Sequence, residues 1–500
     1  MAAIRTSELD ALLRGTNPRD PASCFDLVCH LGPLARWLVR PEILDRIWDW
    51  RRTHWQEHER PASLRPISAA DLPTEPGGCW PIFVTTDAVH RDVLREAFVL
   101  PLRWVRSGDD AGADPLPTSL ADEAERVLAA VMDRRPGAPP ASTPPASSRP
   151  AWSLRWAWSG PAHAGGHAPD ALLGGVLACS SAWTALAGGL VSALRGCPVD
   201  GGVWASAAWE GRPRAVGGLE TKQALAAELG GHVLFAATGD AASTDPSGVE
   251  RRALVNDPDW PIALRDYLAA LIRQPADEAP LSDWGRYHDF VRDTLEDRDL
   301  ALRIYRDRCI PGIIAMWHQR DEVGPPSPCR LIAVVGLQST LVELIVRFLR
   351  PTACLLLMTG ETAKAAAEAC AELEATLPAD DPRADVRRTA LIPRPIRDRF
   401  APDSLATDPE IAAFLDAASD GPLLVDLTGG KKSLSMTVLF GTLRHAPRLI
   451  YVDSDYSAGN RVLIGTERLD LYDPATGGLH TLGQPPSIDG APTGPKPAAT

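Results

Sequence analysis

Residues 422–436 read PLLVDLTGGKKSLSM and indicate how the C-terminal half of the chain folds. The first six residues are largely apolar, which is typical of a short buried strand. The pair Gly429–Gly430 permits a tight turn, and residues 433–445 show the apolar spacing of a helix. A helix that begins at such a turn presents free N–H groups and positive potential, to which the two lysines add charge. The stretch therefore predicts a strand, turn and helix that bind an anion.

The sequence does not favour a nucleoside triphosphate as this anion. A Walker A loop has the spacing G-x-x-x-x-G-K-[ST], whereas GGKKS places a second lysine where the hydroxyl residue belongs. No other part of the sequence supplies that spacing. The motif alone leaves a second interpretation open, namely a solvated turn between a strand and a helix whose lysines bind nothing.

The surrounding sequence places this motif in a larger pattern. From Cys329 onward, strand patterns alternate with helix patterns, as in RLIAVVG, STLVELIVRFLR, ACLLLMTG and ETAKAAAEACAELEATL. This alternation predicts a parallel, doubly wound sheet, whose ligands bind outside the carboxyl ends of the strands. The predicted loops at those ends are GLQST (336–340), TGET (359–362), TGGKKS (428–433) and DSDY (453–456). The lysine motif therefore lies in the predicted pocket.

The combination of VVGLQSTLVELIVRFLRP, LLLMTGET and VDLTGGKKSLSM resembles the CRISPR-associated Rossmann fold (CARF) family over residues 329–482. The resemblance implies a homodimer, formed through this domain, that binds a cyclic oligoadenylate, with cyclic tetra-adenylate favoured. It implies no metal and no further cofactor. Gln338 and Ser339 stand where the family often has prolines, which leaves the ring size of the ligand open. The implied ligand-binding residues are Gly336, Leu337, Gln338, Ser339, Thr340, Thr359, Thr428, Gly429, Gly430, Lys431, Lys432 and Ser433.

A second resemblance concerns residues 202–236, GVWASAAWEGRPRAVGGLETKQALAAELGGHVLFA. This stretch is similar to the Lon-type serine protease domain, in which a strand pair leads to two glycines, a lysine at the start of a helix and a further strand. The resemblance implies that Lys222 is the catalytic base. It implies that Ser181, at the start of an apolar helix upstream, is the nucleophile. Ser180 and Trp183 stand where the family has proline and glycine, so Ser180 remains an alternative nucleophile.

The proposed pair has a chemical requirement that the sequence meets. A serine hydroxyl becomes a nucleophile when a neighbouring base takes its proton. Lysine can be that base only when it is neutral, which requires an apolar setting that lowers its pKa. The stretch AVGGLETKQALAAEL around Lys222 and the alanine-rich helix after Ser181 are compatible with such burial.

Other outputs remain open. Asp200, Glu220 and Lys222 have the residue types of a PD-(D/E)xK metal-dependent nuclease, in which the two carboxylates would hold a divalent cation. That motif belongs on a strand, however, and LETKQALAAEL predicts the start of a helix. The R-x-x-x-x-H pattern of HEPN ribonucleases is absent from the sequence. A catalytically inactive CARF sensor and a transcription regulator are the remaining alternatives.

Composition limits the partners and the compartment. The net charge of −13 over 500 residues argues against binding to nucleic-acid duplexes. Nine cysteines without a C-x-x-C pair predict reduced thiols in a cytoplasmic protein. Residues 171–194 carry no charge, but their glycine, serine and threonine content favours a buried helix over a membrane span.

The predicted fold class is α/β, in which an α+β Lon-type protease domain and a helical connector precede a C-terminal Rossmann-like parallel sheet. The predicted segments are 1–135 (mixed and helical, role unknown), 136–150 (linker), 151–240 (protease), 241–328 (connector), 329–482 (CARF) and 483–500 (disordered tail). The predicted function is a cyclic-oligoadenylate-activated serine protease of a type III CRISPR antiviral system. Without an ATPase motif, it is expected to cut a dedicated partner protein, such as a toxin or regulator encoded nearby.

Overall fold

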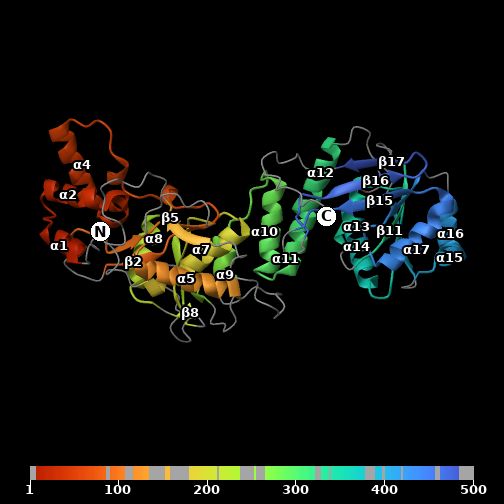
Figure 1. Ribbon diagram of the computed structural model, residues 1–500, viewed down its shortest axis with the longest axis horizontal. Coiled ribbons are helices and arrows are strands. Elements are labelled where there is room, and N and C mark those ends of the chain that lie inside the picture. Colours follow the sequence, from red (N-terminus) through yellow and green to blue (C-terminus); the bar gives the residue numbers. More distant parts are fainter. Residues whose placement is uncertain are drawn as a thin grey trace, which may run out of the picture. The chain divides into compact units, whose positions relative to one another are not determined.

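The computed structural model divides the chain into two compact units (Figure 1). The N-terminal unit comprises Met1–Ala276 and Asp289–Arg298, and the C-terminal unit comprises Asp277–His288 and Asp299–Thr500. The structure describes residues 7–85, 90–106, 116–133, 152–157, 179–210, 213–214, 216–236, 253–254, 265–320, 328–336, 339–377, 389–396, 400–417, 421–456 and 462–482. The predicted linker and tail lie outside these ranges.

The C-terminal unit is built on a seven-stranded sheet in the order β13-β12-β11-β14-β15-β16-β17. Strands β11 to β15 pair in parallel, and β16 and β17 extend the sheet in antiparallel fashion. The order confirms the predicted doubly wound sheet, because the chain builds outward from β11 in one direction and returns to β14 on its other side. The strands are β11 (Arg330–Val334), β12 (Ala353–Met358), β13 (Ala390–Pro395), β14 (Leu423–Asp426), β15 (Arg448–Asp453), β16 (Arg468–Asp473) and β17 (Gly478–Leu482).

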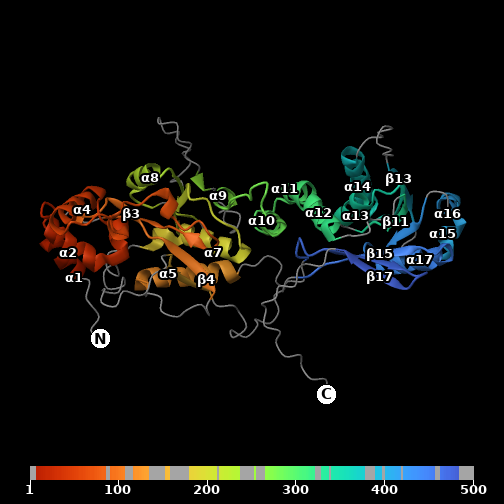
Figure 2. The same ribbon diagram turned by 90° about the horizontal axis from the view of Figure 1, so that it is seen from above.

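Helices cover both faces of this sheet, as Figure 2 shows. The first face carries α13 (Thr340–Leu349) and α14 (Ala363–Thr376). The other carries α15 (Asp403–Thr407), α16 (Pro409–Asp416) and α17 (Lys432–Thr442), whose apolar side chains form one core cluster with alternate residues of β11, β12 and β14. Both faces are buried, which explains why these strands read as continuous apolar runs.

Helices of the predicted connector precede the sheet. They are α9 (Arg265–Leu271), α10 (Leu281–Asp293), α11 (Arg298–Ile304) and α12 (Ile310–Arg320), with the π-helical segment η8 (Tyr305–Cys309) between the last two. Arg306 in η8 makes two hydrogen bonds, of 2.8 and 2.6 Å, to the carboxylate of Glu343, which is fully buried in α13. The last part of the connector is therefore anchored to the sheet domain by a buried ion pair.

The N-terminal unit begins with helices and continues as small sheets. Its helices are α1 (Ser7–Gly15), α2 (Pro21–Leu31), α3 (Ala35–Leu38), α4 (Pro41–Trp55), α5 (Thr118–Asp133), α7 (Trp183–Arg195) and α8 (Leu219–Glu228), with short 3₁₀ turns at η1 (Gly32–Leu34), η2 (Ala62–Leu64), η3 (Ala69–Asp71), η4 (His90–Asp92) and η6 (Cys179–Ala182). Its strands are β1 (Gly78–Cys79), β2 (Ile82–Val84), β3 (Ala97–Val99), β4 (Leu102–Arg106), β5 (Trp152–Trp156), β6 (Val203–Ser206), β7 (Ala208–Trp209), β8 (Pro213–Arg214), β9 (His232–Ala236) and β10 (Ala253–Leu254).

The segments on both sides of the predicted linker share one sheet. β4 pairs with β5 and β1 in antiparallel fashion, while β10, β9 and β6 form a parallel sheet. The separation of residues 1–135 from 151–240 in the sequence prediction therefore does not coincide with the division between the units.

Helix α7 is the buried centre of the N-terminal unit. Gly189 packs so closely against Cys79 of β1 that an added Cβ would lie 2.8 Å from the cysteine Cβ. This close approach accounts for the glycine at position 189. The predicted buried helix is confirmed from Trp183 onward, whereas residues 171–178 lie outside the described residues. Within the described residues, no helix is both long and apolar enough to cross a membrane.

Candidate functional site

A buried lysine lies in the N-terminal unit, on the first turns of α8. Lys222 is 3% exposed, and its Nζ donates a hydrogen bond of 2.8 Å to the hydroxyl of Ser206, which is fully buried at the end of β6. The strand pair β7–β8 and the glycines at 217 and 218 precede α8, and β9 follows it, as the sequence predicted. Ser206 was not predicted from the sequence, because one serine in an apolar strand gives no local signal of its partner.

The setting of Lys222 changes its acid–base properties. Burial lowers the pKa of Lys222 from its ordinary 10.5 to about 8. One neutral hydroxyl replaces only part of the hydration that an exposed ammonium group has, so Ser206 orients Nζ without restoring its full proton affinity. Part of the lysine population is therefore neutral near physiological pH, which is the form that acts as a base.

The turn η6, which holds Ser181, lies next to β6, the strand that ends at Ser206. Ser181 is buried in this 3₁₀ turn, two residues before α7 begins at Trp183, instead of on the first turn of the helix as predicted. The backbone N–H and the hydroxyl of Thr184 donate to the carbonyl of Ala207, at 3.4 and 3.0 Å. Since Ala207 directly follows Ser206, these bonds hold the η6–α7 junction at the end of β6. Ser180 is exposed.

The carboxylates of the alternative nuclease site have different surroundings. Asp200 and Glu220 are exposed, whereas Lys222 is buried. The Asp200 carboxylate accepts the N–H of Gly202 at 2.8 Å, and Glu220 stands on α8, a helix and not a strand. Over the residues that the structure describes, no group of three or more His, Cys, Asp or Glu side chains is arranged to hold a metal ion.

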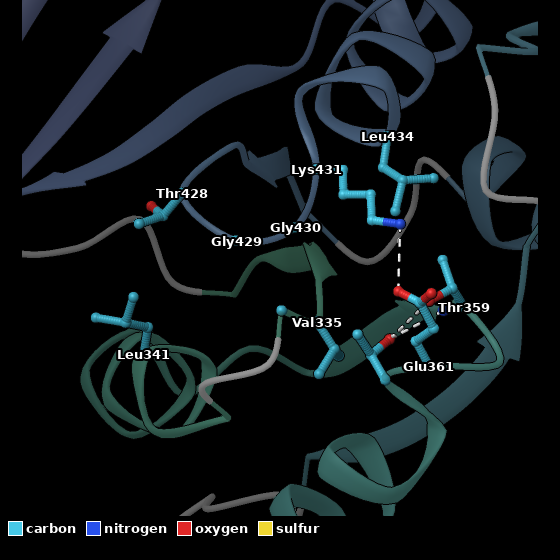
Figure 3. A pocket seen from close by; sticks show the side chains of 11 residues that line it. Val335, Leu341, Thr359, Glu361, Thr428, Gly429, Gly430, Lys431 and Leu434 are labelled. Carbon is cyan, nitrogen blue, oxygen red and sulfur yellow. Dashed lines mark hydrogen bonds and ion pairs between the residues drawn. The ribbon is translucent and has the colours of Figure 1, made fainter. Parts of the chain in front are cut away.

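The C-terminal unit contains a pocket of about 400 Å³ where the loops after β11, β12 and β14 meet (Figure 3). This is the carboxyl edge of the parallel strands at the point where the strand order reverses, the position at which such sheets bind ligands. The lining residues are Val335, Gly336, Leu341, Thr359, Glu361, Thr362, Thr428, Gly429, Gly430, Lys431 and Leu434.

Half of the residues assigned to the ligand from the sequence line this pocket. They are Gly336, Thr359, Thr428, Gly429, Gly430 and Lys431. The others divide into those that do not line it, namely Ser339, Thr340, Lys432 and Ser433, and those outside the described residues, namely Leu337 and Gln338. The pocket also has lining residues that were not predicted from the sequence, namely Val335, Leu341, Glu361, Thr362 and Leu434. Glu361 and Thr362 belong to the TGET loop, whose place at a strand end was the available signal.

The glycine turn is fixed by contact with β11. A Cβ on Gly429 would lie 2.1 Å from the carbonyl oxygen of Val334, so no other residue fits there without displacing the strand. After this turn Lys431 caps α17, whose first N–H groups have no carbonyl partner within the helix. Lys431 Nζ lies 3.2 Å from the carboxylate of Glu361 on the opposite loop (Figure 3). The pocket thus lies at the N-terminus of a helix and contains a cation that already holds a carboxylate.

A buried acid organises the base of the turn. Asp426 is fully buried at the end of β14, and its Oδ1 accepts the N–H of Thr428 at 2.8 Å. The hydroxyl of Thr428 accepts the N–H of Val452 in β15 at 2.8 Å. Burial raises the pKa of Asp426 to about 6. The acid and threonine of the motif therefore connect two neighbouring strands.

Comparisons with known proteins find similarity to solved structures. No family model and no curated protein matches the chain. One similar solved structure is Can2 from Sulfobacillus thermosulfidooxidans in complex with cyclic tetra-adenylate, with 16% identity over 31% of this chain and 37% of that chain and a TM-score of 0.22. Another is a type III CRISPR defence DNA nuclease activated by cyclic oligoadenylate, with 14% identity over 42% of this chain and 35% of that chain and a TM-score of 0.20. The chain spans little more than a third of the length of either protein, and TM-scores this low assign neither fold nor activity.

The buried lysine predicts a specific pH dependence of stability. Between pH 8 and 10.5 Lys222 is neutral in the folded chain and charged in the unfolded chain, so the folded state gains relative stability as pH rises through this window. Relative to Lys222→Met, the wild-type free energy of unfolding should rise by on the order of 3 kcal/mol across the window in urea denaturation. Lys364, whose side chain is 91% exposed, provides the matched control. The difference in free energy of unfolding between the wild type and Lys364→Met should not change with pH across this window. A difference for Lys222→Met that is equally independent of pH would contradict the lowered pKa.

Proposed function

We propose that this protein is a serine protease, with Ser181 as nucleophile and Lys222 as base, whose activity is controlled by a cyclic oligoadenylate bound in the C-terminal pocket. The observation that carries the protease assignment is the buried Lys222, which is hydrogen-bonded to Ser206 and held next to the turn of Ser181. A desolvated lysine beside a serine turn is the arrangement that Ser–Lys catalysis needs.

In the proposed reaction, neutral Lys222 takes the proton of the Ser181 hydroxyl as Oγ attacks the carbonyl carbon of a peptide bond. The resulting ammonium group then donates this proton to the leaving amine, and an ester of Ser181 remains. Lys222 next takes a proton from water, whose hydroxide attacks the ester and releases the second product, and Ser181 regains its proton. Ser206 acts as a positioning residue, since it holds Nζ by a hydrogen bond of 2.8 Å.

The pocket supports the proposed ligand through its mixed lining. Lys431 and the N-terminus of α17 would bind phosphates, and the apolar side chains of Val335, Leu341 and Leu434 would contact adenine bases. A cyclic oligoadenylate carries both groups in a repeating order. An anionic phosphate competes with the carboxylate of Glu361 for Lys431, so ligand binding would release Glu361 and its loop.

A contact path leads from the pocket toward the connector. The hydroxyl of Ser339 lies in the loop after β11 and donates to Glu343 Oε1 at 3.4 Å, and the same carboxylate is held by Arg306 of η8. A ligand that shifts this loop therefore acts directly on the buried ion pair that anchors the connector. Through this path, we propose, a ligand bound in the pocket would change the activity of the protease.

The surface of α17 supports the proposed homodimer. Met436 and Phe440 of α17 are exposed, as is Leu443 at the start of the following 3₁₀ turn η10 (Leu443–His445). These residues recur at helical spacing along one stripe, which Lys432 begins. The exposed ring of Phe400 packs edge-on against Phe440, with centroids 5.9 Å apart. An apolar stripe of this kind is the signature of an interface, and a second copy of the chain is the occupant that we propose. Lys432, outside the pocket of its own chain, would face the partner.

The protease assignment is tested by proteolysis in lysate of the native host, with and without cyclic tetra-adenylate and cyclic hexa-adenylate. Peptide N-termini that arise only with ligand should be found for the wild type and should disappear in Ser181→Ala, because no acyl ester can form. Ser206→Ala should lower the rate by about tenfold or more without abolishing it, since Lys222 loses its positioning partner.

The control for this experiment is Asp200→Ala, which should cleave as the wild type does. Unchanged cleavage by Ser181→Ala would refute the assignment of the nucleophile. If no N-termini arise while added nucleic acid is cut in a metal-dependent manner that Asp200→Ala abolishes, the protein is a nuclease.

The ligand assignment is tested with two variants of opposite expected effect. Lys431→Gln should weaken binding of cyclic tetra-adenylate by about tenfold, because a charge-assisted contact is lost. Glu361→Gln should strengthen binding several-fold, because the carboxylate that competes for Lys431 is removed. Isothermal titration calorimetry measures both, with Lys364→Gln as the control at an exposed lysine outside the pocket. Changes of the same sign in the two variants would contradict the proposed site.

The dimer assignment is tested by sedimentation equilibrium. Phe440→Glu places a charge in the centre of the exposed stripe of α17 and should raise the dimer dissociation constant by about a hundredfold or more. Leu479→Glu, at a comparably exposed side chain on the edge strand β17, is the matched control and should leave the mass unchanged. A wild-type protein that stays monomeric at all concentrations would exclude the interface.

A further inference from the structure

The proposed catalytic group is closed to substrate in this structure. The exposed fractions of Ser181, Lys222 and Ser206 are 8%, 3% and 0%. A peptide carbonyl carbon must come within about 3.5 Å of the nucleophilic oxygen before it can react. Some side chain next to Ser181 must therefore make room for the substrate.

Two stacked tryptophans lie next to the turn of Ser181. Trp183 is the first residue of α7, two positions after Ser181, and is 2% exposed. Its indole stacks on that of Trp209, with ring centroids 4.8 Å apart and planes inclined by 13°. Trp209 ends β7, and β7 contacts both η6 and α7. One face of the Trp183 ring is thus covered by a side chain from another segment.

The covering side chain sits on a weakly held element. β7 and β8 contain two residues each. The residue opposite Trp209 is Pro213, which has no N–H to donate. The ion pair between Glu210 and Arg214 joins side chains that are 69% and 46% exposed, so it contributes little. A hairpin this short is marginal by itself. Stacking on Trp183 is one of the interactions that hold Trp209 in place.

We propose, on the basis of the protease function above, that Trp183 forms the floor of the substrate subsite beside Ser181. In the absence of substrate Trp209 occupies this subsite. A substrate enters by placing an aromatic or large aliphatic side chain on the Trp183 ring in place of Trp209. The stacked pair therefore sets the specificity of cleavage and keeps the unoccupied enzyme inactive.

The reactivity of Ser181 tests the occupancy of the subsite. The full-length wild type, Trp209→Ala and Trp209→Phe are treated with an alkyl fluorophosphonate, with and without cyclic tetra-adenylate, and labelling of Ser181 is followed by mass spectrometry. Without ligand, Trp209→Ala should be labelled about tenfold faster than the wild type, whereas Trp209→Phe, which retains a stacking ring, should stay within about threefold. Trp55→Ala, which removes another partly exposed tryptophan, should match the wild type.

Cleavage specificity is the second readout. Trp209→Ala should cut a peptide mixture at sites that carry Phe, Tyr, Trp or Leu within two positions of the cleaved bond, and Trp183→Phe should shift this preference. Equal labelling of Ser181 in the wild type and Trp209→Ala, or cleavage without such a preference, would overturn the subsite while leaving the protease intact. Absence of labelling at Ser181 in every variant and condition would instead overturn the protease function, and the subsite with it.

Discussion

The N-terminal unit is organised around the burial of one amino group. An ammonium ion that is removed from water must be paired or must give up its proton more readily. Among the described residues, the side-chain partner of Lys222 is the hydroxyl of Ser206. The end of β6, the first turns of α8 and the η6–α7 junction all have to meet for this environment to exist. The same desolvation that costs stability supplies a base. One contact therefore affects both stability and the proposed chemistry.

The sequence predicted the C-terminal unit better than the N-terminal one, for a physical reason. Strands that are buried on both faces read as apolar runs, and the loops that follow them are chemically distinct, so Gly336 and the residues from Thr428 to Lys431 could be assigned to a pocket. Ser206 could not be assigned, because its importance depends on a side chain sixteen residues away. The pairing of β4 with β5 was likewise missed, since cross-strand registers over a long insertion leave no local pattern.

The proposed sensor pocket is not simply electropositive. Lys431 faces Glu361 across the cavity, and both side chains are largely exposed. An anion that binds Lys431 has to displace the carboxylate of Glu361. Its binding free energy is therefore less favourable than it would be at a lysine without an ion-pair partner. In return, binding changes the partners of two loops at once. Ligand binding would therefore move the loops of Lys431 and Glu361. A ligand that bound a cation without an ion-pair partner would not break such a contact between loops.

The chain crosses between the two units three times, after residues 276, 288 and 298, and one of these crossings lies inside α10. Neither unit is a continuous stretch of sequence. A fragment that ends at Ala276 lacks Asp293 and Thr294, which pair with Arg195 at the end of α7. No single cut can separate the two units intact. The two halves are consequently not modules that recombination could exchange at one junction.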